Sequence, residues 1–218
     1  MNWEGQNRRT VDEQKVFCIG RNKTGTTSLK KALAEFGYLV GNQRAAERLI
    51  DAYAVRDFEP IISYCQTAEA FQDVPFSFPY TYIVLDQEFP GSKFILTVRS
   101  GGGEACYDSY LRHQSQRLGL NRLPNAEELK KDTYVYQGWS YKVKQALAPI
   151  TDDKLYDKEQ FVQLYERHVT HVMQYFAHRP EDLLVINVAD RDSYDQLCDF
   201  LGQKPLRERM PWENKTRK

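Results

Sequence analysis

The chain lacks an excess of charge of either sign, because 30 lysines and arginines balance 30 aspartates and glutamates among its 218 residues. Without a net field, nucleic acid and anionic membranes are not expected partners, so any anion site must be local. Long apolar runs are also lacking. No stretch approaches the ~20 apolar residues of a membrane span, and the first 14 residues are polar where a secretory signal would be apolar. We therefore expect no membrane insertion.

Cysteine is scarce as well, with four residues far apart in the sequence: Cys18, Cys65, Cys106 and Cys198. Cys18 and Cys198 lie in apolar segments that are typical of a protein core. This pattern suits reduced thiols better than a disulfide framework or a zinc site. It favours a reducing compartment, and we expect a cytoplasmic protein.

The length suits one sizeable α/β core better than two enzyme domains. Apolar runs predict strands at residues 15–20, 93–98 and 183–188, with a further short strand at 38–40. Helical spacing predicts helices at residues 26–36, 44–53, 80–89, 104–117, 126–147, 158–178 and 193–201. Residues 58–79 carry three prolines, which predicts irregular structure around a pocket.

This alternation of strands and helices predicts a single domain over residues 1–218, with polar ends at 1–14 and 212–218. The expected fold class is α/β, with a mostly parallel sheet flanked by helices. Ligands of such sheets bind at the carboxyl ends of the strands.

The most informative segment is the loop from Gly20 to Ser28, between the first strand and the first helix. Its two glycines, five residues apart, match the spacing of a phosphate-binding P-loop, in which backbone amides and a helix N-terminus attract anions. A Walker A loop has Lys and Ser/Thr directly after its second glycine. Here Thr26 and Thr27 follow that glycine and Lys23 lies inside the loop, which weakens an ATPase or kinase interpretation.

A second departure lies at the end of the strand at residues 93–98. Magnesium-dependent P-loop enzymes usually have an aspartate there, whereas this strand ends at Arg99. Lys23, Arg99 and helix-end amides can neutralise phosphate without magnesium, and a sulfuryl group carries less charge than a γ-phosphoryl group. The two departures together favour metal-free sulfuryl transfer.

Four segments resemble the sulfotransferase superfamily that uses 3′-phosphoadenosine 5′-phosphosulfate: GRNKTGTTSL, FPGSKFILTVRS, YDSY, and the pair LLVINV and YDQLCDFLG. The resemblance implies a fold like that of P-loop nucleoside-triphosphate hydrolases. It also implies this nucleotide as donor, 3′-phosphoadenosine 5′-phosphate as product, and no required metal. The implied cofactor-binding loop is Arg21, Asn22, Lys23, Thr24, Gly25, Thr26, Thr27 and Ser28, with Lys23 as the catalytic cation.

The resemblance further implies that Arg99 and a downstream serine hold the 3′-phosphate. Ser109 in YDSY is the best counterpart for this serine. Because Gly101 to Gly103 lengthen the link, Ser100 is an alternative.

A general base in this superfamily is a histidine or a carboxylate, and no motif identifies it here. We assign the catalytic base to Asp73, beside Pro75 in the expected pocket wall, with Asp86 and His113 as alternatives. The acceptor is expected to be a small molecule with a hydroxyl or an amine, bound by residues from 42–82 and 121–141. The oligomeric state stays open.

Two other functions compete with this one. The first is a magnesium-ATP-dependent small-molecule kinase on a similar fold, and the second is a phosphoadenosine-binding module without catalysis. His168 and His171 lie three apart on an expected helix, but no third ligand lies near them in sequence, so we expect packing or surface positions and no metal site.

Overall fold

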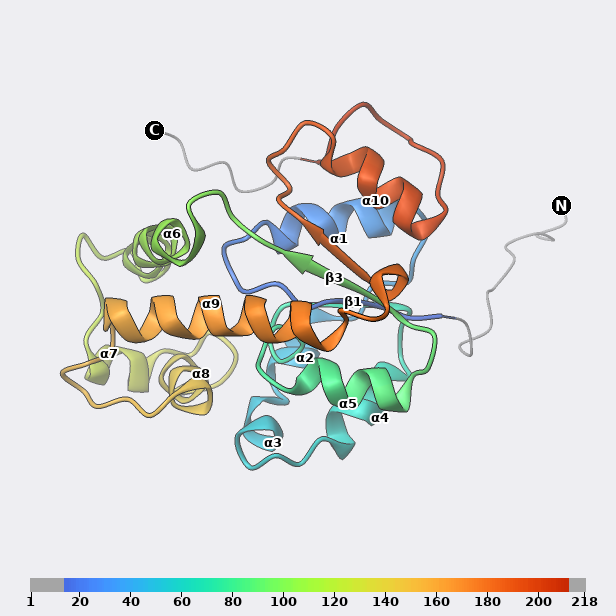
Figure 1. The fold of residues 1–218 in the computed structure, drawn as a ribbon. Coiled ribbons are helices and arrows are strands. Elements are labelled where there is room, and N and C mark those ends of the chain that lie inside the picture. The colour runs from blue at the N-terminus through green and yellow to red at the C-terminus, as the bar shows by residue number, and fades with distance from the viewer. Residues whose placement is uncertain (1–13, 212–218) are drawn as a thin grey trace, which may run out of the picture.

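Four short strands form one parallel sheet in the computed structural model, which describes residues 14–211 (Figure 1). The strands are β1 (Val16–Cys18), β2 (Ala70–Gln72), β3 (Lys93–Thr97) and β4 (Leu183–Ile186), and their order across the sheet is β2-β1-β3-β4. Every neighbouring pair is parallel, as the alternation of strands and helices predicts.

The topology reverses direction at β1. Val16 pairs with Ala70 of β2 on one side and with Lys93 of β3 on the other, so the chain first winds to one side of β1 and then to the opposite side. In open parallel sheets a crevice forms at such a switch point, at the carboxyl ends of the two strands that flank it. The loop after β1 and the residues after β3 are therefore the places to look for a ligand site.

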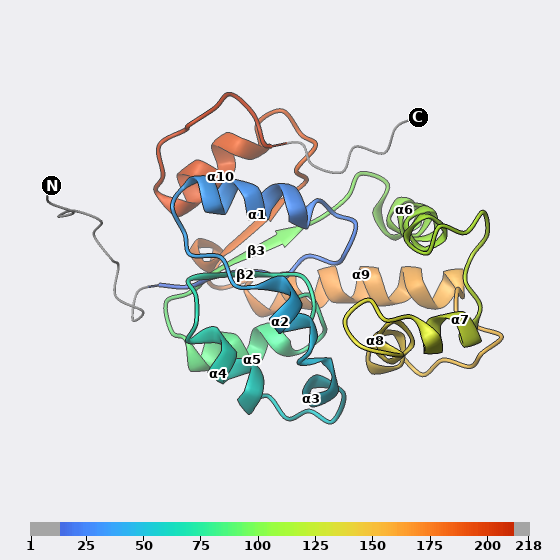
Figure 2. The same ribbon diagram turned by 180° about the vertical axis from the view of Figure 1, so that it is seen from behind.

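Side chains of the strands alternate between two buried layers. Phe17 and Phe94 point into the layer covered by α4 (Glu59–Cys65), α5 (Thr81–Glu88) and α9 (Lys158–Tyr175). Cys18 and Ile95 point to the opposite layer, covered by α1 (Thr26–Glu35) and α10 (Ser193–Leu201). Figures 1 and 2 show these two groups of helices on opposite faces of the sheet.

A group of helices extends beyond the carboxyl ends of the strands (Figure 2). It consists of α6 (Gly102–Arg117), α7 (Ala126–Lys131), α8 (Trp139–Leu147) and the first half of α9. The helix α6 packs along α9, and α8 contacts α7 and α3 (Ile50–Ala54). These helices thus face the loop that follows β1.

Two expected helices are each divided in the structure. The helix expected at 44–53 is α2 (Gln43–Glu47) and α3, separated at Arg48 and Leu49. The helix expected at 126–147 is α7 and α8, because Asp132 is extended and Gly138 adopts a φ of 82°. An ion pair of 2.7 Å between Asp132 and Arg117 of α6 holds the intervening turn, a tertiary contact that the helical spacing does not reveal.

The expectation of irregular structure at 58–79 was wrong for much of this segment, which contains α4 and β2. Pro60 lies in the first turn of α4, where a proline needs no amide partner and helps a helix to begin. The strand expected at 38–40 is a single bridge between Val40 and Ala70. The helix expected to end at 178 ends at Tyr175 and is followed by a 3-10 turn, η1 (Pro180–Asp182).

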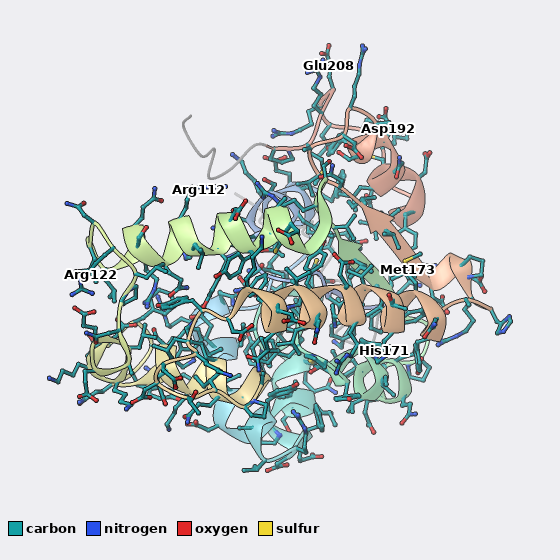
Figure 3. All side chains as sticks on the ribbon, turned by 60° about the vertical axis from the view of Figure 1, so that its left-hand side comes forward. Arg112, Arg122, His171, Met173, Asp192 and Glu208 are labelled. Atoms are coloured by element: carbon teal, nitrogen blue, oxygen red, sulfur yellow. The ribbon has the colours of Figure 1, made fainter. Side chains whose placement is uncertain are left out.

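The four cysteines are buried and carry free thiols, as expected. His168 is buried, and its Nε2 lies 2.8 Å from the carbonyl oxygen of Ile19, whereas His171, labelled in Figure 3, is exposed. Within residues 14–211, no three His, Cys, Asp or Glu side chains cluster as metal ligands would. In the same residues no helix is both long and apolar enough to cross a bilayer. The polar ends at 1–13 and 212–218 lie outside the described residues.

Candidate active site

The loop between β1 and α1 is pressed against the ends of β3 and β4 at its two glycines. A Cβ on Gly20 would lie 2.0 Å from Oγ1 of Thr97, and a Cβ on Gly25 would lie 2.1 Å from Cγ2 of Val188. Gly25 also has a φ of 100°, which side chains rarely adopt. Both positions therefore need glycine, for closeness to the neighbouring strands as well as for the turn.

Side chains from the loop, from the last residue of β3 and from the residues just after it hold the loop by hydrogen bonds. The hydroxyl of Thr24 donates to the carbonyl of Arg21 at 2.5 Å and lies 2.5 Å from the hydroxyl of Thr97, which then acts as donor. Arg99 donates from Nη1 to the carbonyl of Lys23 at 2.8 Å. The loop conformation thus depends on the end of β3. Because the hydroxyl proton of Thr24 is used within the protein, a hydrogen bond from Thr24 to an anion would come from its backbone amide.

The helix α1 begins at Thr26, and its N-cap is Gly25, which has no side chain that could cap the helix. The first turn of α1 contains no acidic residue. An uncapped helix N-terminus carries a partial positive charge and amide donors, so it attracts anions. This end of α1 opens toward the same loop.

Three cations surround the loop without a close acidic partner. In residues 14–211, no carboxylate oxygen lies within 4.0 Å of the side-chain nitrogens of Arg21, Lys23 or Arg99. Arg21 is 8% exposed, donates to the carbonyl of Ser77 at 3.4 Å, and lies 5.3 Å from the ring of Phe78. Burial and the charge of Arg99 lower the pKa of Lys23. Clustered cations of this kind suit a ligand with several negative charges.

The assigned residues line one cavity of about 610 Å³, a size typical of ligand sites. The lining includes the whole loop assigned from sequence, namely Arg21, Asn22, Lys23, Thr24, Gly25, Thr26, Thr27 and Ser28. Arg99, Ser100 and Ser109 line it too. Ser100 accepts a hydrogen bond of 2.8 Å from Asn187 after β4, and Ser109 is buried on α6, whose Cys106 contacts the loop.

A family model described as "Sulfotransferase domain" matches residues 15–218. The chain belongs to this sulfotransferase family. Among curated proteins no match was found. The match spans the sheet, the loop after β1 and the helices beyond it, so the resemblance of four short segments extends to the whole described fold.

Two of the three possible bases of this sulfotransferase line the cavity. Asp73 follows β2 at the carboxyl end of the sheet and accepts a hydrogen bond of 3.0 Å from the amide of Val74. Burial raises the pKa of Asp73, although the charges of Lys23 and Arg21 oppose this shift. His113 faces the cavity from α6, and the cavity walls together with the charges of Lys23 and Arg117 lower its pKa to about 4.

Asp86 lies elsewhere, on α5. Its carboxylate accepts hydrogen bonds of 2.7 and 3.0 Å from Arg179 and one of 2.7 Å from Tyr175. These bonds lower the pKa of Asp86 despite its partial burial. Asp86 is thus part of a structural ion pair with Arg179 and does not line the cavity.

The cavity wall beyond the loop was only partly predicted. The ranges 42–82 and 121–141 supply Glu47, Asp73, Phe78 and Trp139, but much of the wall comes from α6, α8 and the start of α9. The missed residues include Tyr107, Tyr110, Arg117, Lys144, Tyr156 and Phe161. A signal did exist, since residues 107, 110, 113, 114 and 117 are spaced as one face of a helix and are aromatic or polar.

Proposed function

We propose that this sulfotransferase transfers a sulfuryl group from 3′-phosphoadenosine 5′-phosphosulfate to a hydroxyl or an amine of a small acceptor. The observation that carries the proposal is the set of three cations, Arg21, Lys23 and Arg99, around an uncapped helix N-terminus in one cavity. A nucleotide with a phosphosulfate and a second phosphate presents separated anionic groups that fit such a set.

The residues of the loop have distinct roles in this proposal. The donor carries its sulfuryl group on a phosphate oxygen, and the nucleotide phosphate is a good leaving group. Lys23 stabilises the negative charge that grows on that oxygen, and the amides at the start of α1 hold the sulfuryl oxygens. Arg99, together with Ser100 or Ser109, binds the 3′-phosphate. The tight seating of Gly20 and Gly25 keeps these groups in place before the reaction.

The acceptor proton is the remaining requirement. The acceptor oxygen or nitrogen forms a bond to sulfur while the bond from sulfur to the phosphate oxygen breaks, and the proton goes to a base. We assign this base to Asp73, since it lines the cavity and interacts electrostatically with Lys23. Because its pKa is raised, its carboxylate is a stronger base than an exposed one.

The proposal is tested by calorimetry of 3′-phosphoadenosine 5′-phosphate binding without magnesium, with ATP as competitor. We expect metal-free binding that ATP displaces poorly and that Lys23→Ala and Arg99→Ala weaken. A preference for magnesium-ATP would instead identify a kinase. Incubation with the phosphosulfate and a panel of phenols, alcohols, sugars and amines follows. Nucleotide binding without transfer to any acceptor would favour a binding module without catalysis.

A further inference from the structure

Lys144 of α8 lies in the wall of the cavity, among aromatic side chains from other elements. Its Nζ contacts the hydroxyl of Tyr110 on α6 and donates to the carbonyl of Leu155 at 3.2 Å. The same atom lies 4.6 Å from the ring centre of Tyr110 and 4.3 Å from that of Tyr156. Phe161 stacks on Tyr110 at 5.0 Å between ring centres. An ammonium group therefore lies in a cage of aromatic rings.

The charge of Lys144 is not balanced. Within residues 14–211, no carboxylate oxygen lies within 4.0 Å of its Nζ. The neighbouring cation, Arg117, is balanced by Asp132 at 2.7 Å and donates to Ser140 at 2.9 Å. Burial, assisted by the charge of Arg117, lowers the pKa of Lys144 to about 7. The lowered pKa means that the charged form of Lys144 is destabilised by its loss of hydration. A bound anion would offset this desolvation penalty, whereas the phenol and carbonyl partners offset only part of it.

We propose that Lys144 binds an anionic group on the acceptor, so that the substrates are aromatic molecules carrying a carboxylate, a sulfate or a phosphate. The inference rests on the proposed function and adds the substrate class. The ring of the acceptor packs against the edges of Tyr110, Tyr156 and Phe161, because Lys144 and Phe161 already cover the ring of Tyr110. Its anion meets Lys144, and its hydroxyl or amine lies toward Lys23 and Asp73. Aromatic edge contacts and one ion pair are the kinds of contact that fix a small ligand in an apolar pocket.

Other ionisable groups occupy the elements around Lys144. They are Tyr107, Tyr110, His113 and Arg117 on α6, Asp132 before α8, Tyr156 and Asp157 before α9, and Asp51 on α3, which pairs with the exposed Lys142 at 3.1 Å. Asp132 is bound to Arg117, and Asp51 to Lys142. Asp157 caps α9 and accepts a hydrogen bond of 2.8 Å from the amide of Gln160. None of the three carboxylates forms an ion pair with Lys144.

The first test uses two probes of nearly the same shape, the anionic 4-hydroxyphenylacetate and the neutral 4-hydroxyphenylacetamide, on protein saturated with 3′-phosphoadenosine 5′-phosphate. We expect the carboxylate to bind at least about 10-fold more tightly, as one charge-assisted hydrogen bond allows. Lys144→Met should abolish this preference and leave the Kd of the nucleotide unchanged, which also shows that the variant folds. Lys142→Met, on the same helix but outside the cavity, should keep the preference.

The second test is proton uptake, measured by calorimetry at pH 8 in buffers of different ionisation enthalpy. At this pH a lysine with a pKa of about 7 is mostly neutral, and an anion that raises its pKa makes it take up a proton. We expect uptake with the carboxylate probe in the wild type and none in Lys144→Met. Equal binding of both probes, binding of neither, or a preference that survives in Lys144→Met overturns the proposal. Failure of the proposed function is separate, because it would show as a wild type that does not bind the nucleotide.

Discussion

Arg99 donates a hydrogen bond of 2.8 Å from Nη1 to the carbonyl oxygen of Lys23, so a residue just after β3 holds the loop that follows β1. The bond brings the proposed ligand of the 3′-phosphate into contact with the proposed catalytic residue. It also uses only one of the donors of a guanidinium, which has five. The remaining donors are available to a ligand while the bond to the loop persists.

Arg99→Ala should therefore weaken binding of 3′-phosphoadenosine 5′-phosphate by about 10- to 100-fold, the range that one lost charge-assisted hydrogen bond of ~1.5–3 kcal/mol gives. Calorimetry without magnesium measures the change. Arg122→Ala is the matched control, because Arg122 is exposed, pairs with Glu128, and lies outside the cavity (Figure 3). A Kd of Arg99→Ala within twofold of that of the wild type would show that Arg99 does not bind the nucleotide.

Gly25 offers a second prediction, because two physical effects at this position can be separated. Gly25→Ala introduces a Cβ that overlaps Val188 and places a side chain at a φ of 100°. We expect a loss of ~2–4 kcal/mol in the free energy of unfolding, from overpacking and left-handed strain together. Urea unfolding measures it. In Gly25→Ala combined with Val188→Ala, the overlap is relieved and the strain remains, so the loss relative to Val188→Ala alone should be smaller but not zero. Full additivity of the two substitutions would contradict the contact.

The parallel sheet and the loop after β1 could be predicted from the sequence because their signals are local. A buried apolar strand, a loop with glycines and a helix follow one another within residues 15–36, and Arg99 directly follows the next strong strand. Topology then brings the ends of β1 and β3 together, since parallel neighbours end at the same edge. No long-range information was needed beyond the strand order.

The missed features depend on contacts between distant segments. The strand β2 has three residues, and it is stabilised by pairing with β1 and by the rings of Phe17 and Phe71, which stack at 5.6 Å. The break between α7 and α8 depends on the ion pair of Asp132 with Arg117, 15 positions earlier in the chain. The cavity wall beyond the loop likewise forms where α6, α8 and α9 meet, so its members could not be recognised from any one segment.

The burial of His168 leads us to expect a loss of stability in mild acid. Its Nε2 lies 2.8 Å from the carbonyl of Ile19, and burial, with the charge of Arg21, lowers its pKa from 6.5 to about 4. Between these two pKa values the unfolded chain binds a proton at this histidine and the folded chain does not. The free energy of unfolding should accordingly fall as the pH drops from about 6.5 to about 4, by at most ~3 kcal/mol from this group. In His168→Gln this part of the pH dependence should disappear. In His171→Gln, on the exposed face of α9, it should remain; equal curves for both variants would contradict the assignment.

Asp73 leads to a prediction in which activity and stability change in opposite directions. Asp73→Asn removes the proposed base, so kcat with the phosphosulfate donor should fall by about 100-fold or more, within the range for general bases. Burial raises the pKa of Asp73 above its usual value of 3.8, so the folded chain holds a proton more firmly than the unfolded chain does. The free energy of unfolding therefore falls as the pH rises from about 3.8 to the folded pKa, and the full cost of the charged carboxylate is present above that pKa.

Asp73→Asn should consequently raise the free energy of unfolding at pH 7, and the part of this gain that depends on pH should vanish below about pH 3.8, where both states of the wild type are protonated. Any gain from the preference of asparagine for the φ of 67° at this position is the same at every pH and can be subtracted.

Asp86→Asn is the matched control, because loss of its pair with Arg179 should lower stability at pH 7 without changing kcat. If Asp73→Asn instead kept full kcat, His113 would be the remaining candidate of those assigned from the sequence that lines the cavity, and His113→Gln should then lower kcat and remove the acid limb of the rate profile. If Asp73→Asn lowered kcat and destabilised the protein at pH 7 as well, Asp73 would act as a structural partner of Lys23 and Arg21, because a carboxylate that mainly balances charge stabilises the folded state.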